Sequence, residues 1–286
     1  MLTFGIMGPQ SIRRAAAVAG TWYPGQPARL AAEVRRYFDR VATAVTGEII
    51  GLVSPHAGLV YSGPVAAHAY RQLEGRTYDV IVLVGPDHHV GFEGVSIFPR
   101  GVFETPLGDL PIAEGVADAV MAATPVVRDL PAAHRWEHSL EMQLPFLQSV
   151  LPGVPIVPLV MGLQAPATVA ALAGGLATAL RGRRPLLVAS SDLSHRQESR
   201  RAAQLDRVIV EAVGRFDPEA VELAIASYTN HACGGGPIVA VMRAARALGA
   251  RDARVLCYAD SSAVSGDTSE VVGYMAAVFG TLAPAS

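Results

Sequence analysis

The sequence predicts an α/β protein built as a single three-layer sandwich, with a central sheet between two layers of helices. Two short apolar runs, residues 49–53 and 80–84, have the pattern of strands that are buried on both faces. Each run is followed by a polar loop and then a helical pattern, and this order recurs along the chain. Repeated strand, loop and helix units build a sheet that is covered by helices on both faces.

The size and composition indicate one compact domain. A chain of 286 residues is long enough for one large α/β domain, and 51% hydrophobic against 17% charged residues indicates a large core. Neither an internal repeat nor a low-complexity linker divides the sequence. We therefore expect a single domain over residues 1–286, with residues 1–12 as a flexible N-terminal arm.

The charge and the N-terminal sequence restrict the compartment and the partners. A formal net charge of -2 provides no general attraction to nucleic acids or anionic membranes. The N-terminus lacks the basic region and long apolar core of a signal peptide, and no apolar run is long enough to cross a bilayer. We expect a cytoplasmic protein that binds neither nucleic acid nor membrane. The chain has no lysine and no phosphate-binding loop, which excludes Schiff-base chemistry through a lysine.

The elements follow from periodicity and from helix start signals. Strands are expected at residues 49–53, 80–84, 154–160, 185–190, 254–258 and 271–279. Helices are expected at residues 27–42, 112–123, 139–150, 165–180, 199–215, 218–227 and 237–248. Ser62 is expected to cap a further, alanine-rich helix. Residues 103–109 are assigned to a long loop.

Histidines follow each of the first two predicted strands. His56 lies in the segment 54–58, and His88 and His89 end the segment 85–89. Ligands of open α/β sheets bind at the carboxyl edge of the strands, so these side chains are expected to meet there. Adjacent residues of an extended chain point in opposite directions, so only one of His88 and His89 is expected to face the pocket.

Asp192 and His195 form a third polar cluster, after the strand at residues 185–190. They suit a carboxylate that orients an imidazole, although a helix cap with a surface histidine would give the same pattern. Glu137 and His138 precede an amphipathic helix. Glu137 could belong to the site, but a carboxylate that only complements the helix dipole would occur at the same position.

Cys233 is a candidate soft ligand or nucleophile. Pro237 suits the first turn of a helix, which would place the thiol near a positive helix end and favour the thiolate. The three glycines after Cys233 suggest a close approach to its backbone. Cys257 lies in an apolar strand and is better explained as a small buried side chain. His68, His134 and His231 are best explained by packing.

Six spaced motifs together resemble the Memo family, in order from about residue 13 to residue 280. They occupy residues 19–24, 55–58, 85–89, 137–141, 190–195 and 233–234. The resemblance implies a fold similar to that of the class III extradiol ring-cleavage dioxygenases, which hold non-haem Fe(II) with two histidines and a glutamate. It says less about function than about fold.

The resemblance also implies roles for individual residues. His56 and His88 match the two metal-site histidines of the family, and Cys233 stands where the dioxygenases have the glutamate. His195 matches the catalytic histidine of the dioxygenases, with Asp192 beside it. His89, His138 and Glu137 are expected in the layer around the ligands. A thiolate suits Cu(I) and Zn(II) as well as iron, so iron is the first expectation and copper or zinc the alternatives.

We therefore expect one mononuclear metal pocket and an iron-dependent, dioxygenase-like oxidoreductase that acts on a small molecule. One alternative is a non-catalytic module that binds a peptide or an anion, since the animal Memo protein binds phosphotyrosine peptides. Another is a hydrolase with Cys233 as nucleophile, His195 as base and Asp192 as the orienting group. Prokaryotic relatives often accompany a radical SAM protein, which the resemblance implies as a functional partner.

Overall fold

The computed structural model describes residues 12–284, so most of the expected N-terminal arm lies outside the described residues. The strands are β1 (Arg13–Arg14), β2 (Gly47–Ser54), β3 (Val80–Pro86), β4 (Val95–Ile97), β5 (Val102–Thr105), β6 (Gly108–Pro111), β7 (Val127–Asp129), β8 (Ile156–Met161), β9 (Pro185–Ser190), β10 (His195–Gln197), β11 (Asp252–Asp260) and β12 (Val271–Leu282). The α-helices are α1 (Pro27–Phe38), α2 (Leu59–Tyr70), α3 (Glu114–Ala123), α4 (Ala132–Arg135), α5 (Leu144–Val150), α6 (Pro166–Ala179), α7 (Ser199–Gly214), α8 (Pro218–Ser227), α9 (Gly235–Ala247) and α10 (Ser262–Ser265). Short 3₁₀ helices lie at Arg71–Leu73, Glu141–Gln143 and Thr229–His231.

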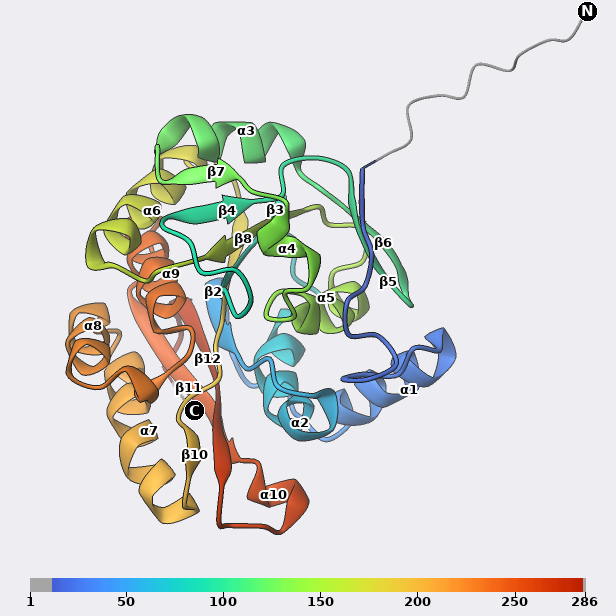
Figure 1. The fold of residues 1–286 in the computed structure, drawn as a ribbon, viewed down its shortest axis with the longest axis vertical. Coiled ribbons are helices and arrows are strands. Elements are labelled where there is room, and N and C mark those ends of the chain that lie inside the picture. The colour runs from blue at the N-terminus through green and yellow to red at the C-terminus, as the bar shows by residue number, and fades with distance from the viewer. Residues whose placement is uncertain (1–11, 285–286) are drawn as a thin grey trace, which may run out of the picture.

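The main sheet has nine strands in the order β10-β12-β2-β9-β3-β8-β4-β7, with β11 beside β12. In Figure 1 the sheet lies between two groups of helices, α2 with α1 and α5 on one side and α9 with α6, α8 and α7 on the other. The predicted α/β sandwich is confirmed. A separate three-stranded sheet, β1-β5-β6, includes the first described residues of the chain.

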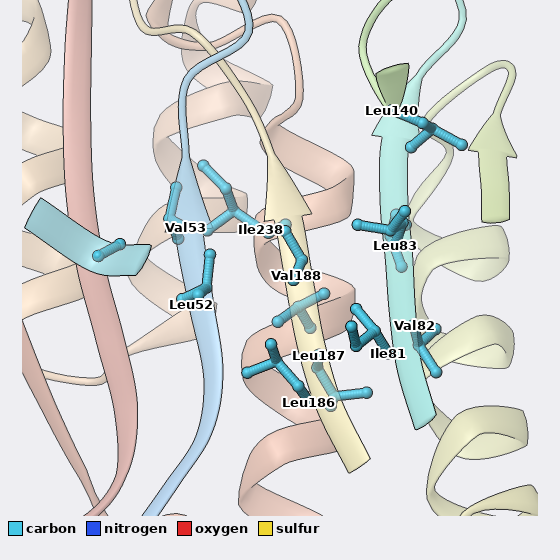
Figure 2. Packing of buried hydrophobic residues seen from close by; sticks show 14 of the residues in the cluster. Leu52, Val53, Ile81, Val82, Leu83, Leu140, Leu186, Leu187, Val188 and Ile238 are labelled. Carbon is cyan, nitrogen blue, oxygen red and sulfur yellow. The ribbon is translucent and has the colours of Figure 1, made fainter. Parts of the chain in front are cut away.

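The centre of the sheet is parallel and largely buried. Strands β2, β9, β3 and β8 run in one direction, whereas β12 is antiparallel to β2, and β4 is antiparallel to β8. Every residue of β3, β8 and β9 is buried, as expected for strands that are covered by helices on both faces. Figure 2 shows apolar side chains of β2, β9 and β3 packed together with Ile238 of α9.

Helix starts account for three departures from the predicted elements. Helix α2 begins at Leu59, so Ser62 lies inside its first turn, where its hydroxyl donates to the Ala57 carbonyl at 2.7 Å. Helix α9 begins at Gly235, two residues before Pro237. The segment 139–150 starts as a 3₁₀ turn and becomes α-helical at Leu144, because Pro145 has no N–H and fits only the first turn.

Residues 103–109 are not a loop but most of the β5–β6 hairpin. Its turn places Gly108 at φ +116°, a conformation that favours glycine. The Thr105 hydroxyl donates to the Gly108 carbonyl at 3.1 Å and stabilises the turn. The two strands are short and local polar contacts hold their turn, so the sequence has no alternating apolar pattern that would predict them.

A buried ion pair attaches the first described strand to the body of the protein. Arg14 and Glu141 are 4% and 0% exposed, and they form a direct ion pair. The same Glu141 carboxylate accepts the Ala17 amide at 2.7 Å, the Val18 amide at 3.0 Å and the Tyr23 hydroxyl at 2.6 Å. Removal of either charge would leave the other buried without a partner.

We expect Arg14→Met to lower the free energy of unfolding by about 3–5 kcal/mol, because it leaves the buried Glu141 carboxylate unpaired. Urea denaturation followed by circular dichroism measures this change. The matched control is Arg13→Met, since Arg13 is an exposed neighbour whose ion pairs with Glu104 and Asp109 are solvated. Equal midpoints for the two variants would contradict the importance of the buried pair.

Candidate metal centre

Three parallel strands deliver polar loops to one edge of the sheet. Strand β9 lies between β2 and β3, and all three run in the same direction. His56 follows β2, His88 follows β3, and Asp192 and His195 follow β9. The three loops therefore end at the carboxyl edge, where α/β sheets bind their ligands.

The rings of His56, His88 and His138 gather at this edge. One possible ligand atom from each ring lies within 4.8 Å of those of the other two. The rings of His88 and His138 stack with their centroids 4.5 Å apart, and the ring of His56 meets that of His88 edge-on at 5.3 Å. Burial, followed by the nearby His56, lowers the pKa of His138 to about 3. Neutral imidazoles are common metal ligands, so the cluster can hold an ion.

Glu137 orients His88. Its carboxylate accepts the His88 amide at 2.7 Å, His88 Nδ1 at 2.9 Å and the Ser139 amide at 2.8 Å. Burial acts to raise the pKa of Glu137, but the hydrogen bond from His88 and the amide of Ser139 lower it to about 2. Burial acts to lower the pKa of His88, and Glu137 outweighs it and raises this pKa. Because Nδ1 of His88 donates to Glu137, Nε2 is the atom left for a ligand.

Ser190 sets the tautomer of His56. The Ser190 hydroxyl donates its one proton to the Ser139 carbonyl at 2.6 Å and accepts Gln143 Nε2 at 2.7 Å. It therefore accepts a hydrogen bond from His56 Nδ1, 2.8 Å away, which leaves the lone pair of the ring on Nε2. Burial, and then the charge on His88, lower the pKa of His56 well below its usual range. His56 is thus neutral, as a metal ligand needs to be.

Cys233 adjoins the cluster from the start of α9. Its Sγ lies 3.2 Å from His56 Nε2 and 3.6 Å from the Asp192 carbonyl oxygen. Burial, and then the charge of Asp192, raise the pKa of the Cys233 thiol. The thiolate expected from the helix start is therefore not favoured without a bound cation, because desolvation outweighs the helix dipole. Burial raises the pKa of Cys257 as well.

Asp192 holds the loop that carries His56. Its Oδ1 accepts the His56 amide at 2.7 Å and the Ala57 amide at 3.3 Å, and its Oδ2 lies 4.0 Å from His195 Nε2. Burial raises the pKa of Asp192, although His195 and the two amides act against this. His195 Nδ1 donates to the Leu193 carbonyl at 2.9 Å, so Nε2 is free to accept a proton in the neutral ring.

His89 lies outside the group of converging rings. It is exposed, and its amide donates to Asp87 Oδ1 at 3.3 Å. Its ring centroid is 6.0 Å from that of His138. Of the two adjacent histidines, His88 faces the cluster and His89 lies at its rim.

Several residues around the imidazoles were missed by sequence reasoning. Gln143 donates to Ser190, and it accepts the Tyr70 hydroxyl at 2.6 Å. Trp22 packs against His138 with ring centroids 4.3 Å apart. A small polar residue at the last position of a buried strand could have pointed to Ser190, but a glutamine in a helical pattern carries no such signal.

The glycines after Cys233 are explained by packing within the chain. A Cβ on Gly234 would lie 2.4 Å from the Ser190 carbonyl oxygen, and one on Gly235 would lie 2.2 Å from Ile225. The close approach suggested by the sequence is therefore made by the protein itself. These glycines let α9 start against β9 and so fix the position of Cys233.

Comparison with known proteins shows the family of the chain. A family model described as Memo-like protein matches residues 14–278. The MEMO1 family protein MTH_45 of Methanothermobacter thermautotrophicus is 35% identical over 271 residues, which cover 91% of this chain and 98% of that protein. A MEMO1 family protein of Thermotoga maritima is 36% identical over 282 residues, covering 93% and 99%.

The chain belongs to the Memo family.

One solved structure shares the fold of this Memo family chain at low sequence identity. The crystal structure of the uncharacterized protein JW3007 from Escherichia coli K12 aligns with a TM-score of 0.53 and 15% identity. It covers 82% of this chain and 100% of the other. At this identity the likeness supports the fold alone. Within residues 12–284, none of the helices combines the length and apolarity needed to cross a membrane.

We expect Gly234→Ala to destabilise the protein and to displace Cys233, because the added Cβ would collide with the Ser190 backbone. The loss should be about 1–3 kcal/mol in the free energy of unfolding, measured by urea denaturation. Gly174→Ala is the matched control, since nothing lies within 4 Å of its Cβ position in α6. Alanine should stabilise that exposed helical site by about 1 kcal/mol. Equal effects at the two positions would contradict the packing role of Gly234.

Proposed function

We propose that this Memo family protein holds one metal ion between His56, His88 and a third ligand, and uses it in redox chemistry on a small molecule. The convergence of three imidazoles, with one ligand atom of each within 4.8 Å of the others, carries the proposal. Two of these rings have Nδ1 engaged by Glu137 or Ser190, which leaves their Nε2 atoms for a metal. Such outer hydrogen bonds are typical of metal-binding histidines.

The donor set fits a transition metal better than magnesium or calcium. Imidazole nitrogen suits iron, copper and zinc, whereas magnesium and calcium prefer oxygen ligands. Two neighbours of His56 are candidates for the third ligand: the ring of His138 and the thiol of Cys233. We propose iron as the native metal, and a thiolate from Cys233 would make copper or zinc the alternatives.

The protein groups around this centre suit proton transfer. A non-haem iron would supply the redox chemistry with dioxygen when it is bound. His195 is 38% exposed in its side chain, and its Nε2 carries the free lone pair. It can accept a proton from a substrate hydroxyl at that atom, while the carboxylate of Asp192, 4.0 Å away, stabilises the resulting cation.

We expect the purified protein to bind one metal ion per chain and the variant His56→Ala/His88→Ala to lose it, because two imidazole ligands are removed. Elemental analysis of protein purified without air or chelators measures the metal content. His68→Ala is the control, since His68 lies on α2 away from the cluster. Equal metal content in the double variant and the wild type would rule out this site.

The same measurement on His138→Ala and on Cys233→Ser identifies the third ligand. Substitution of the third ligand should remove most of the metal. Substitution of a residue that only surrounds the site should lower the metal affinity by about 10–100-fold.

We expect His195→Ala to keep the fold and most of the metal affinity but to lower turnover by about 10²–10⁴-fold, because it removes the proton acceptor. The assay follows oxygen uptake by the iron-loaded protein across a set of catechols and related small molecules. If His195→Ala loses its metal as completely as the His56 and His88 variant, then His195 is a ligand and not a base.

Two alternatives predict different results in that assay. A peptide- or anion-binding module would consume no oxygen, yet a phosphotyrosine peptide would bind and protect Cys233 from alkylation. A cysteine-dependent hydrolase would need no metal. In this structure, however, the thiol of Cys233 is not activated as a nucleophile. Burial raises the pKa of Cys233, and its Sγ lies beside His56 instead of the expected base His195.

A further inference from the structure

A cavity lies at the opposite end of the sheet from the histidines. It has a volume of about 460 Å³ and is lined by the first residues of β2 and β9, by the loops before β3 and before β9, and by the end of α9. The parallel strands β2 and β9 run from this cavity toward the histidine cluster. The two sites are therefore separated by the length of the sheet, and neither shares a lining residue with the other.

The cavity is strongly basic. Four arginines line it, Arg76, Arg181, Arg183 and Arg184, whereas Glu48 is the one acidic residue of its lining. This imbalance gives the cavity a positive potential despite the net charge of -2 for the whole chain.

Two of these arginines are already engaged within the protein. Arg76 donates to the carbonyls of Val45, Gly47 and Gln72, so it serves to hold the chain before β2. Arg184 pairs with Asp79 at 3.8 Å.

Arg181 and Arg183 have no such partners. Both are exposed, and within residues 12–284 neither guanidinium forms an ion pair or donates a hydrogen bond to the protein. Arginines after a helix often complement the negative end of its dipole, and these two follow α6. Neither binds the last carbonyls of α6, however, so two planar donor groups remain directed to solvent at the wall of a cavity.

Other residues of the cavity lining are less polar. Tyr78 is half-buried, and its hydroxyl donates to the Ile49 carbonyl at 3.0 Å, which fixes the ring. Leu248, just after α9, and Ile50 of β2 also line the cavity. A single inorganic anion would occupy little of about 460 Å³, a volume within the usual range for pockets that take small organic ligands.

We propose that this cavity binds a small organic phosphate of nucleotide size, with its phosphoryl groups on Arg181 and Arg183 and its apolar part against Tyr78 and Leu248. Guanidinium groups bind phosphate oxygens through paired N–H donors, which suits two unengaged arginines that line the same cavity from one short loop. This site is independent of the metal centre and goes beyond the redox function proposed above.

Isothermal titration of the full-length protein with ADP at low salt tests the proposal. We expect one ADP to bind per chain, with pyrophosphate as a competitor and adenosine much weaker, because the phosphoryl groups carry the charge-assisted hydrogen bonds. Arg181→Ser/Arg183→Ser should weaken ADP binding by about tenfold or more while it leaves the circular dichroism and the metal content unchanged.

The control is Arg200→Ser/Arg201→Ser, a pair of exposed arginines on α7 whose loss changes the net charge equally. ADP binding should survive in this variant. Absence of saturable binding of both ADP and pyrophosphate to the wild type would overturn the proposal, as would an equal loss in the two double variants. Binding of RNA or of anionic vesicles through Arg181 and Arg183, with no binding of ADP, would also overturn it in favour of a macromolecular partner.

Discussion

The parallel order of β2, β9 and β3 is the constraint on which the rest of the site depends. Because neighbouring parallel strands end at the same edge, the loops after them come together without any specific contact between them. All three strands carry apolar side chains into both helical layers, so a shift of register would disrupt the packing against both layers. The sheet therefore places His56, His88 and His195 at one edge before their own hydrogen bonds refine their positions.

Two buried carboxylates then fix the positions of the loops that carry the histidines. Glu137 binds the backbone and the ring of His88, and Asp192 binds the amides at His56 and Ala57. A buried carboxylate without partners would be costly, whereas these two are used mainly to hold backbone amides. The imidazoles are consequently held in place by the protein alone, which is the preorganised state that a tight metal site requires.

Features that depend on strand pattern could be predicted from the sequence, and features that depend on tertiary contacts could not. The apolar runs predicted the central strands, and the family motifs predicted the relationship now shown. The family motif placed His138 near the site, but its convergence with His56 and His88 depends on where an irregular segment lies against the end of β3, which no periodic pattern indicates. The helix start near Cys233 suggested a thiolate, but desolvation decides its pKa, and burial depends on the whole fold.

The three histidines of the cluster are far apart in the sequence, so the cluster forms only when distant parts of the chain have folded together. His56, His88 and His138 follow different strands or turns, so no single hairpin or helix contains two of them. Folds rich in contacts between distant parts of a chain form slowly, and the three imidazoles cannot meet before residue 138 has been synthesised. An ion that binds only the finished fold would stabilise the entire domain, by about 2.7 kcal/mol when its free concentration is about a hundredfold above its Kd. Under the proposed metal binding, the supply of metal would therefore affect the stability of the whole fold and not only that of the site.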